Sequence, residues 1–220
     1  MSTKPTALFS TPKKTAHPEK FSSGPCTSFL PSGKEKVFIK DISGHMFRIK
    51  VRSFSVSDDL PILFKWISRE YAGPLLARSC PPRELEESYT SMIASDFAQP
   101  FMVLVNDTPV CQMDIYKTQQ DALSLSYPAR PGDFGLQLVI APLAVQEHLV
   151  LVLSTCLEHF FSFPEVGRII VNVDDGNEYN EHLFKKVGFR SLYEIRSTYR
   201  SSSLYVCAAS HFREVQVVAP

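Results

Sequence analysis

The sequence predicts an α/β domain, of the α+β kind, with a central mixed and mostly antiparallel sheet flanked by about four helices. Two observations carry this prediction. Short apolar runs occur in pairs around turn residues, as antiparallel hairpins require. In addition, the strand–helix unit at 168–189 has capping residues before its helix and a glycine after it. With 220 residues, of which 44% are hydrophobic, the chain can bury a sizeable core.

The first 33 residues differ from the rest, because they hold five prolines among Ser, Thr and Lys. We expect a disordered N-terminal extension over residues 1–33, with a targeting peptide as the alternative, and a single domain over residues 34–220. No apolar run in the extension reaches the length of a signal-peptide core or a membrane span.

The charge balance and the cysteines exclude several classes of protein. Lys and Arg total 23, as do Asp and Glu, so the net charge of zero gives no electrostatic footprint for nucleic acid or an anionic membrane. The five cysteines are far apart and lack CxxC or CxxH spacing, which argues against a disulfide framework or a metal site. We therefore expect a cytoplasmic protein without nucleic-acid, membrane or metal partners. A homodimer is compatible with the sequence.

The first elements are expected to be a hairpin and a helix. Alternating apolar residues predict strands at 37–39 and 46–54. Ser57 or Asp58 is expected to cap the following helix, and Pro61 is expected in its first turn, where proline is tolerated.

The middle of the chain predicts one more helix and a run of strands. The helix is expected at 82–97, from its stripe of apolar residues. Strands are expected at 101–105, 110–116, 123–127 and 134–140, since apolar runs alternate there with turn residues.

The last third predicts a buried helix and the strand–helix unit. A helix at 143–161 is apolar nearly all round and should be buried. A β-branched strand then leads to a helix with turn and cap residues at 174–177, lysines in its last turn and Gly188 just after it. Two antiparallel strands, at 191–198 and 204–209, close the domain.

In this order, the elements from about residue 46 to 215 resemble the GNAT superfamily of acyl-CoA N-acyltransferases. Several segments look like motifs of its siderophore-biosynthesis branch, which acylates an N-hydroxylated lysine or a diamine. They are LPILFKW at 60–66, PVCQMDIY at 109–116, DFGLQ at 133–137 and VDDGN at 173–177. Aminoglycoside 6'-N-acetyltransferases share much of the same skeleton.

The resemblance implies that an amine or hydroxylamine nitrogen of a small acceptor attacks the thioester of acetyl-CoA or a longer acyl-CoA. It implies Asp174 as the catalytic residue that orients or deprotonates this nitrogen. Gln137 stands where the siderophore branch has a histidine, and glutamine can position an acceptor but cannot take a proton at neutral pH. The implied substrate contacts are Trp66, Asp114 and Tyr116.

For the cofactor, the resemblance implies a backbone donor on the strand that ends at Ile140. The implied cofactor-binding residues are Leu138, Val139, Ile140, Val145, Gln146, Asn177 and Phe184. Two features depart from the family pattern. The loop at 141–148, which should cradle the pyrophosphate, has no glycine, and Phe184 replaces the tyrosine that protonates the leaving thiolate in many members.

Three functions remain open on the sequence alone. The first is acylation of a hydroxylamine or diamine, the second is acylation of an aminoglycoside-like or other amine, and the third is an inactive binding or scaffolding protein with the same fold. Most of the named residues also have a structural interpretation. Trp66 fits a core, Asp174 an Asx turn or helix cap, Asn177 a cap, and Asp114 and Tyr116 a solvated face of the sheet.

Overall fold

The computed structural model describes residues 37–42, 47–68, 81–121, 124, 127–142, 146–196 and 201–212. The predicted extension at 1–33 lies outside the described residues. Within them, eight strands form one sheet in the order β1-β2-β3-β4-β5-β6-β8-β7, in which only β5 and β6 pair in parallel. The predicted α/β class with a mixed, mostly antiparallel sheet is confirmed.

The strands are β1 (Phe38–Ile42), β2 (Phe47–Ser53), β3 (Ala98–Val105), β4 (Thr108–Lys117), β5 (Asp133–Ile140), β6 (Arg168–Asp174), β7 (Arg190–Arg196) and β8 (Ser201–Ala208). The α-helices are α1 (Val56–Ile67), α3 (Pro82–Ala94), α4 (Gln146–Phe161) and α5 (Glu178–Lys186). In the part of the chain that the structure describes, no helix is long and apolar enough to cross a membrane.

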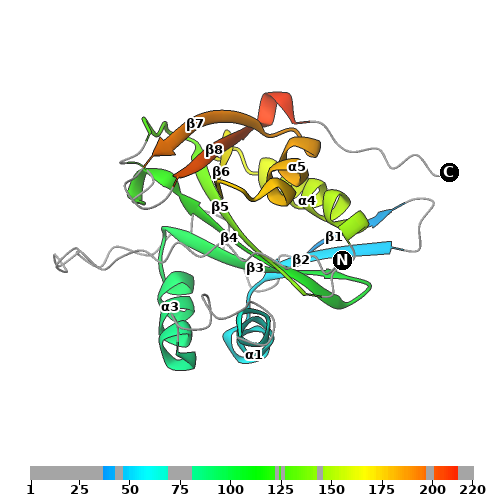
Figure 1. Ribbon diagram of the computed structural model, residues 1–220. Helices are drawn as coiled ribbons and strands as arrows, with labels where there is room; N and C mark the ends of the chain where they lie inside the picture. The colour runs from blue at the N-terminus through cyan, green and yellow to red at the C-terminus, as the bar shows by residue number, and fades with distance from the viewer. Residues whose placement is uncertain are drawn as a thin grey trace.

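The helices cover both faces of the sheet. Helices α4 and α5 lie on one face, and α1 and α3 lie on the other (Figure 1). Alternation along the strands supplies both layers with apolar side chains. On β3, Phe101 and Val103 pack in the core beneath α4, whereas Met102 and Leu104 pack with side chains of α1 and α3.

Helix α1 begins two residues earlier than expected, so the predicted caps at Ser57 and Asp58 are wrong. Ser55 is the N-cap, and its side chain accepts a hydrogen bond from the backbone N–H of Asp58. The buried Asp59 carboxylate fixes this start, because it accepts the Ser55 N–H and two N–H groups of Arg52. Pro61 consequently lies in the second turn of the helix and not in the first.

The end of one helix and one expected strand also differ from the prediction. Helix α3 ends at Ala94, because the Ser95 hydroxyl accepts the N–H groups of Phe97 and Ala98 and so starts β3 early. A strand at 123–127 was also expected. The structure describes only Ser124 and Tyr127 there, and neither is in a strand.

The two ends of α5 follow from local chemistry, as expected. The Asn177 side chain accepts the Asn180 N–H and caps the helix. At the other end, Gly188 has φ of +101°, and the N–H groups of Gly188 and Phe189 bond back to the carbonyls of Lys185 and Phe184. This is the Schellman arrangement, and its apolar contact is the pair of rings Phe184 and Phe189, with centroids 5.1 Å apart.

The parallel strands β5 and β6 separate soon after they meet. Their pairing runs from Asp133 opposite Arg168 to Gly135 opposite Ile170 and then ends, whereas β5 continues beside β4 as far as Ile140. We call this divergence of β5 from β6 the splay. The backbone of β5 beyond Gly135 has a strand partner on its β4 side only, among the described residues.

An ion pair closes the splay at its narrow end. The Arg168 guanidinium donates two hydrogen bonds to the buried Asp133 carboxylate, at 2.6 and 2.7 Å. The Tyr127 hydroxyl and the Arg130 N–H also bond to this carboxylate. The first residue of β5 is thereby fixed to the first residue of β6.

Gly135 lies at the last paired position, directly under a tyrosine ring. A Cβ atom on Gly135 would lie 2.1 Å from Cζ of the buried Tyr116. We expect Gly135→Ala to destabilise the fold by about 1–3 kcal/mol, because this ring must move or the strands must separate. Chemical denaturation measures the effect, and the double variant with Tyr116→Leu should recover part of the loss. A single variant as stable as the wild type would contradict this packing.

Candidate active site

A buried carboxylate lies in the middle of the sheet, on the face covered by α1 and α3. Asp114 of β4 is only 6% exposed. Its Oδ1 accepts a hydrogen bond from Nε2 of Gln112 at 2.5 Å, and its Oδ2 accepts one from the Tyr89 hydroxyl of α3 at 3.3 Å. The alternative of a solvated sheet face is therefore wrong for this residue.

The environment of Asp114 changes its acidity. Burial raises the pKa of this carboxyl from 3.8 to about 7, and the hydrogen bonds from Gln112 and Tyr89 oppose the rise. A carboxyl with a pKa near neutrality can accept a proton in the middle of the physiological range. Asp114 thus has the acidity of a general base.

Tyr116 and Gln137 surround Asp114 on the same face. Gln137 is directly opposite Asp114 in the β4–β5 pairing, and Tyr116 is opposite Gly135, so the three side chains project together. Burial raises the pKa of the Tyr116 hydroxyl well above its ordinary value, and hydrogen bonding with Gln137 opposes this rise. The structure therefore brings together three of the predicted site residues.

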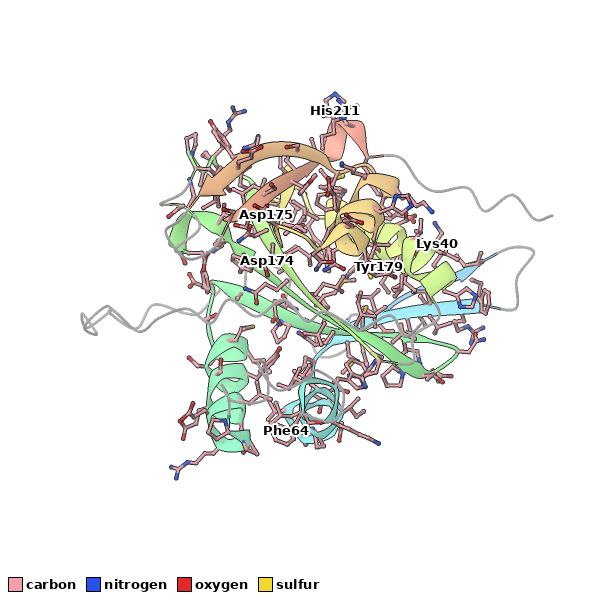
Figure 2. All side chains as sticks on the ribbon, in the orientation of Figure 1. Lys40, Phe64, Asp174, Asp175, Tyr179 and His211 are labelled. Atoms are coloured by element: carbon pink, nitrogen blue, oxygen red, sulfur yellow. The ribbon has the colours of Figure 1, made fainter. Side chains whose placement is uncertain are left out.

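Trp66 lies in the same layer but in apolar surroundings. It is half-buried on α1 and packs against a cluster that includes Leu63, Tyr89 and Val139. Figure 2 shows Phe64 of α1 and Tyr179 of α5 on opposite sides of the sheet. Asp114 bonds to Tyr89 of α3, which packs with α1, so the helix of Trp66 covers the Asp114 side.

The predicted cofactor residues of β5 line the splay. Leu138 and Val139 are buried and Ile140 is half-buried. Leu138 and Ile140 contact the core beneath α4, and Val139 contacts the cluster beneath α1. Since β6 does not pair with this stretch, the β5 backbone has N–H and C=O groups available to an extended ligand arm between the strands.

The other predicted cofactor residues follow in chain order. Val145 lies outside the described residues, and of Gln146 only the backbone is described, as the first residue of α4. Asn177 caps α5 through its oxygen, while its Nδ2 is buried without a hydrogen-bond partner. Phe184 is only 1% exposed and belongs to the core.

Asp174 lies at the last residue of β6, opposite Ser202 of β8, and is half-buried. Figure 2 labels it together with Asp175, where β6 leads toward α5. It alternates with the buried Val171 and Val173, whose side chains enter the core beneath α4. Asp174 therefore projects toward the opposite face of the sheet, which is also the face of Asp114.

Three residues of this region were not singled out from the sequence. Gln112 lies two residues before Asp114 on the same strand and so projects to the same face as Asp114 and Tyr116. The strand pattern could therefore have revealed it. Asn172 shares the alternation of Asp174 in the same way. Tyr89 gave no signal, since it lies on a helix 25 positions away in sequence from the carboxylate that it contacts.

Comparison with known proteins identifies the family. The model of the acetyltransferase (GNAT) domain matches residues 55–197, which include Asp114, the splay and α5. The chain belongs to the GNAT acetyltransferase family. It is accordingly an acyl-CoA-dependent N-acyltransferase that acts on amines, and the inactive scaffold left open by the sequence is not favoured.

Several relatives of this GNAT protein are known. The N-hydroxyputrescine acetyltransferase of Acinetobacter baumannii is 22% identical over 169 residues, which cover 76% of this chain and 81% of the relative. Among solved structures, an uncharacterized protein from Bacillus halodurans has a TM-score of 0.71 and 21% identity, over 80% of this chain and 92% of its own.

The aminoglycoside acetyltransferase AAC(6')-Ib in complex with coenzyme A has a TM-score of 0.65 and 17% identity, over 74% of this chain and 96% of its own. At this identity the likeness supports the GNAT fold. Coenzyme A bound in such neighbours agrees with acyl-CoA as the co-substrate of the family. Among the described residues, no group of three or more His, Cys, Asp or Glu side chains could hold a metal ion.

Proposed function

We propose that the protein acylates a small aliphatic hydroxylamine or diamine, such as N-hydroxyputrescine or N6-hydroxylysine, in siderophore biosynthesis. The observation that carries the proposal is the buried Asp114, which has a pKa of about 7 and lies beside the splay. The named activity of the Acinetobacter relative supports the acceptor class.

Between heavy atoms, the reaction forms a carbon–nitrogen bond and breaks a carbon–sulfur bond, and one proton moves from nitrogen to sulfur. The acceptor nitrogen attacks the thioester carbonyl, its N–H proton passes to the Asp114 carboxylate, and the carbon–sulfur bond breaks to give the amide and CoA thiolate, which regains a proton. A hydroxylamine is far less basic than an alkylamine, so its nitrogen is neutral at pH 7 and has a free electron pair. A base with a pKa of about 7 suits such a nucleophile.

The surroundings of Asp114 favour a small acceptor. Its neighbours Gln112, Tyr89 and Gln137 are uncharged, so the described surface around the carboxylate is mixed and not strongly acidic. An aminoglycoside carries several ammonium groups, which need several carboxylates to offset them. A hydroxylamine or diamine needs fewer.

For the co-substrate, we propose that acetyl-CoA or a longer acyl-CoA enters the splay from the α4 side. Leu138 and Ile140, whose backbone groups alternate away from β4, would then offer them to the pantetheine arm, and Asn177 would offer its buried Nδ2. Val139 between them would keep its backbone groups on β4 and hold this stretch of β5 in place. Asp174 would orient the acceptor from β6. The free thiols of Cys111, Cys156 and Cys207 agree with a reducing compartment, the cytoplasm.

Two measurements test this function. Calorimetric titration with acetyl-CoA, a longer acyl-CoA and desulfo-CoA should show saturable binding near the micromolar range, roughly −8 kcal/mol. Turnover should then be compared for N-hydroxyputrescine, N6-hydroxylysine, putrescine and kanamycin. We expect the highest kcat/KM with a hydroxylamine. A clear preference for kanamycin, or no CoA binding at millimolar concentration, would overturn the proposal.

The hydrogen bond from Tyr89 gives a test of the base. This bond stabilises the charged form of Asp114, so Tyr89→Phe should raise the pKa of Asp114 further. The acid limb of the profile of kcat/KM against pH should therefore move to higher pH, while the rate at the alkaline plateau changes little. Tyr179→Phe, on the far side of the sheet, is the matched control. An unmoved acid limb in Tyr89→Phe would show that Asp114 does not govern it.

A further inference from the structure

A row of polar side chains crosses the splay on the α1 and α3 face. Asp114 of β4 is opposite Gln137 of β5. Asn172 of β6 lies two residues beyond Ile170, as Gln137 lies two residues beyond its partner Gly135. Because side chains alternate along strands, Asn172 and Gln137 project to the same face on the two sides of the splay. We call Asp114, Gln137 and Asn172 the polar row.

Asn172 has a polar end that the protein itself does not satisfy. Its Oδ1 is buried and has no hydrogen-bond partner. Its pairing partner on β8 is Leu204, a fully buried leucine whose side chain cannot donate a hydrogen bond. A buried acceptor without a donor destabilises a fold, and such a group in a native protein calls for an explanation. A donor supplied by a ligand provides one.

We infer that Asn172 binds the distal amino group of a diamine acceptor whose reacting nitrogen lies at Asp114. This inference rests on the proposed function and specifies its substrate. The row spans one strand spacing from β4 to β5 and a wider gap across the splay, so its ends lie at least roughly 10 Å apart. An extended four- or five-carbon chain with a hydrogen bond at each end reaches about this far. Asp174, two residues further on the same face of β6, adds a negative charge that favours an ammonium group there.

A comparison of two substrates in the wild type and in variants of Asn172 tests this assignment. N-hydroxyputrescine and N-butylhydroxylamine share the reacting group and the chain, but only the first has a distal amine. In the wild type we expect kcat/KM to favour N-hydroxyputrescine by about 10- to 100-fold, as expected for a hydrogen bond from a charged group. In Asn172→Leu this preference should fall at least tenfold, and Asn172→Ala should give the same fall.

A readout of stability separates binding from damage to the fold. Asn172→Leu removes the unsatisfied oxygen and keeps the size of the side chain, so its Tm should rise by about 2–4 °C. The matched control is Gln99→Met, which removes another buried oxygen without a partner. Gln99 is opposite Ile115, so it lies on the α4 face. Its substrate preference should equal that of the wild type.

The outcomes distinguish the two proposals. If the wild type acylates both hydroxylamines equally, or if Asn172→Leu keeps the full preference, the assignment of Asn172 is overturned while the proposed function stands. An equal loss with both substrates and weaker desulfo-CoA binding would assign Asn172 to the cofactor and also overturn it. If the wild type acylates neither substrate, the proposed function fails, and the assignment fails with it.

Discussion

Asp114→Asn is expected to lower kcat/KM for the acceptor by about 10²- to 10⁴-fold, because an amide cannot take the proton that the nitrogen releases. The acid limb of the pH profile near pH 7 should disappear with the carboxyl. Steady-state rates from pH 5 to 9 measure both effects. Asp174→Asn is the informative comparison, since we expect it to raise KM for the acceptor and to keep the acid limb.

Asp114→Asn should lower the activity of the protein but raise its stability. The pKa of Asp114 is about 7 in the fold against 3.8 when unperturbed, so the folded state binds more protons between about pH 4 and pH 7. The wild type therefore loses stability as the pH rises through this window. Asp114→Asn should have a higher Tm than the wild type at pH 8, and the difference should shrink at pH 5. Full activity, or a lower Tm at pH 8, would contradict this role of Asp114.

Arg168→Met is expected to destabilise the protein by about 3–5 kcal/mol, because the buried Asp133 carboxylate loses its charged partner. For a chain of this size the loss lowers Tm by roughly 6–20 °C. Since this pair closes the narrow end of the splay, CoA binding should weaken in the folded fraction as well. Differential scanning calorimetry and CoA titration measure the two effects.

An exposed pair supplies the control for this prediction. Arg83 and Glu87 form an ion pair on the surface of α3, where Arg83→Met should cost less than about 1 kcal/mol. The double variant Arg168→Met with Asp133→Leu should recover most of the stability, because no unpaired charge remains. Equal stability of Arg168→Met and the wild type would show that the ion pair does not hold the splay.

The order of the elements and the ends of α5 could be predicted from the sequence because they depend on neighbours in the chain. A two-residue alternation identifies a strand wherever it folds, and Asn177 and Gly188 act within a few residues of their own helix. The resemblance also indicated Asp114, Tyr116 and Gln137, because each belongs to a motif that is one uninterrupted stretch of sequence within a single strand. The predicted start of α1 was wrong although its cause is local, because the Asp59 carboxylate accepts the Ser55 N–H and pairs with Arg52. Several residues at 55–58 can cap a helix, and only this side-chain geometry selects Ser55.

The properties that make a site of these residues come only from the tertiary structure. The pKa of Asp114 depends on burial under α1 and α3 and on the Tyr89 hydroxyl, and no local pattern contains either. Asn172 and Gln137 lie on one face of the sheet, on the two sides of the splay, because β5 and β6 begin parallel and in register and then separate. Desolvation and strand register are set by packing between segments that are far apart in sequence. The sequence by itself therefore determined which residues are available, and the tertiary structure decided which of them act together.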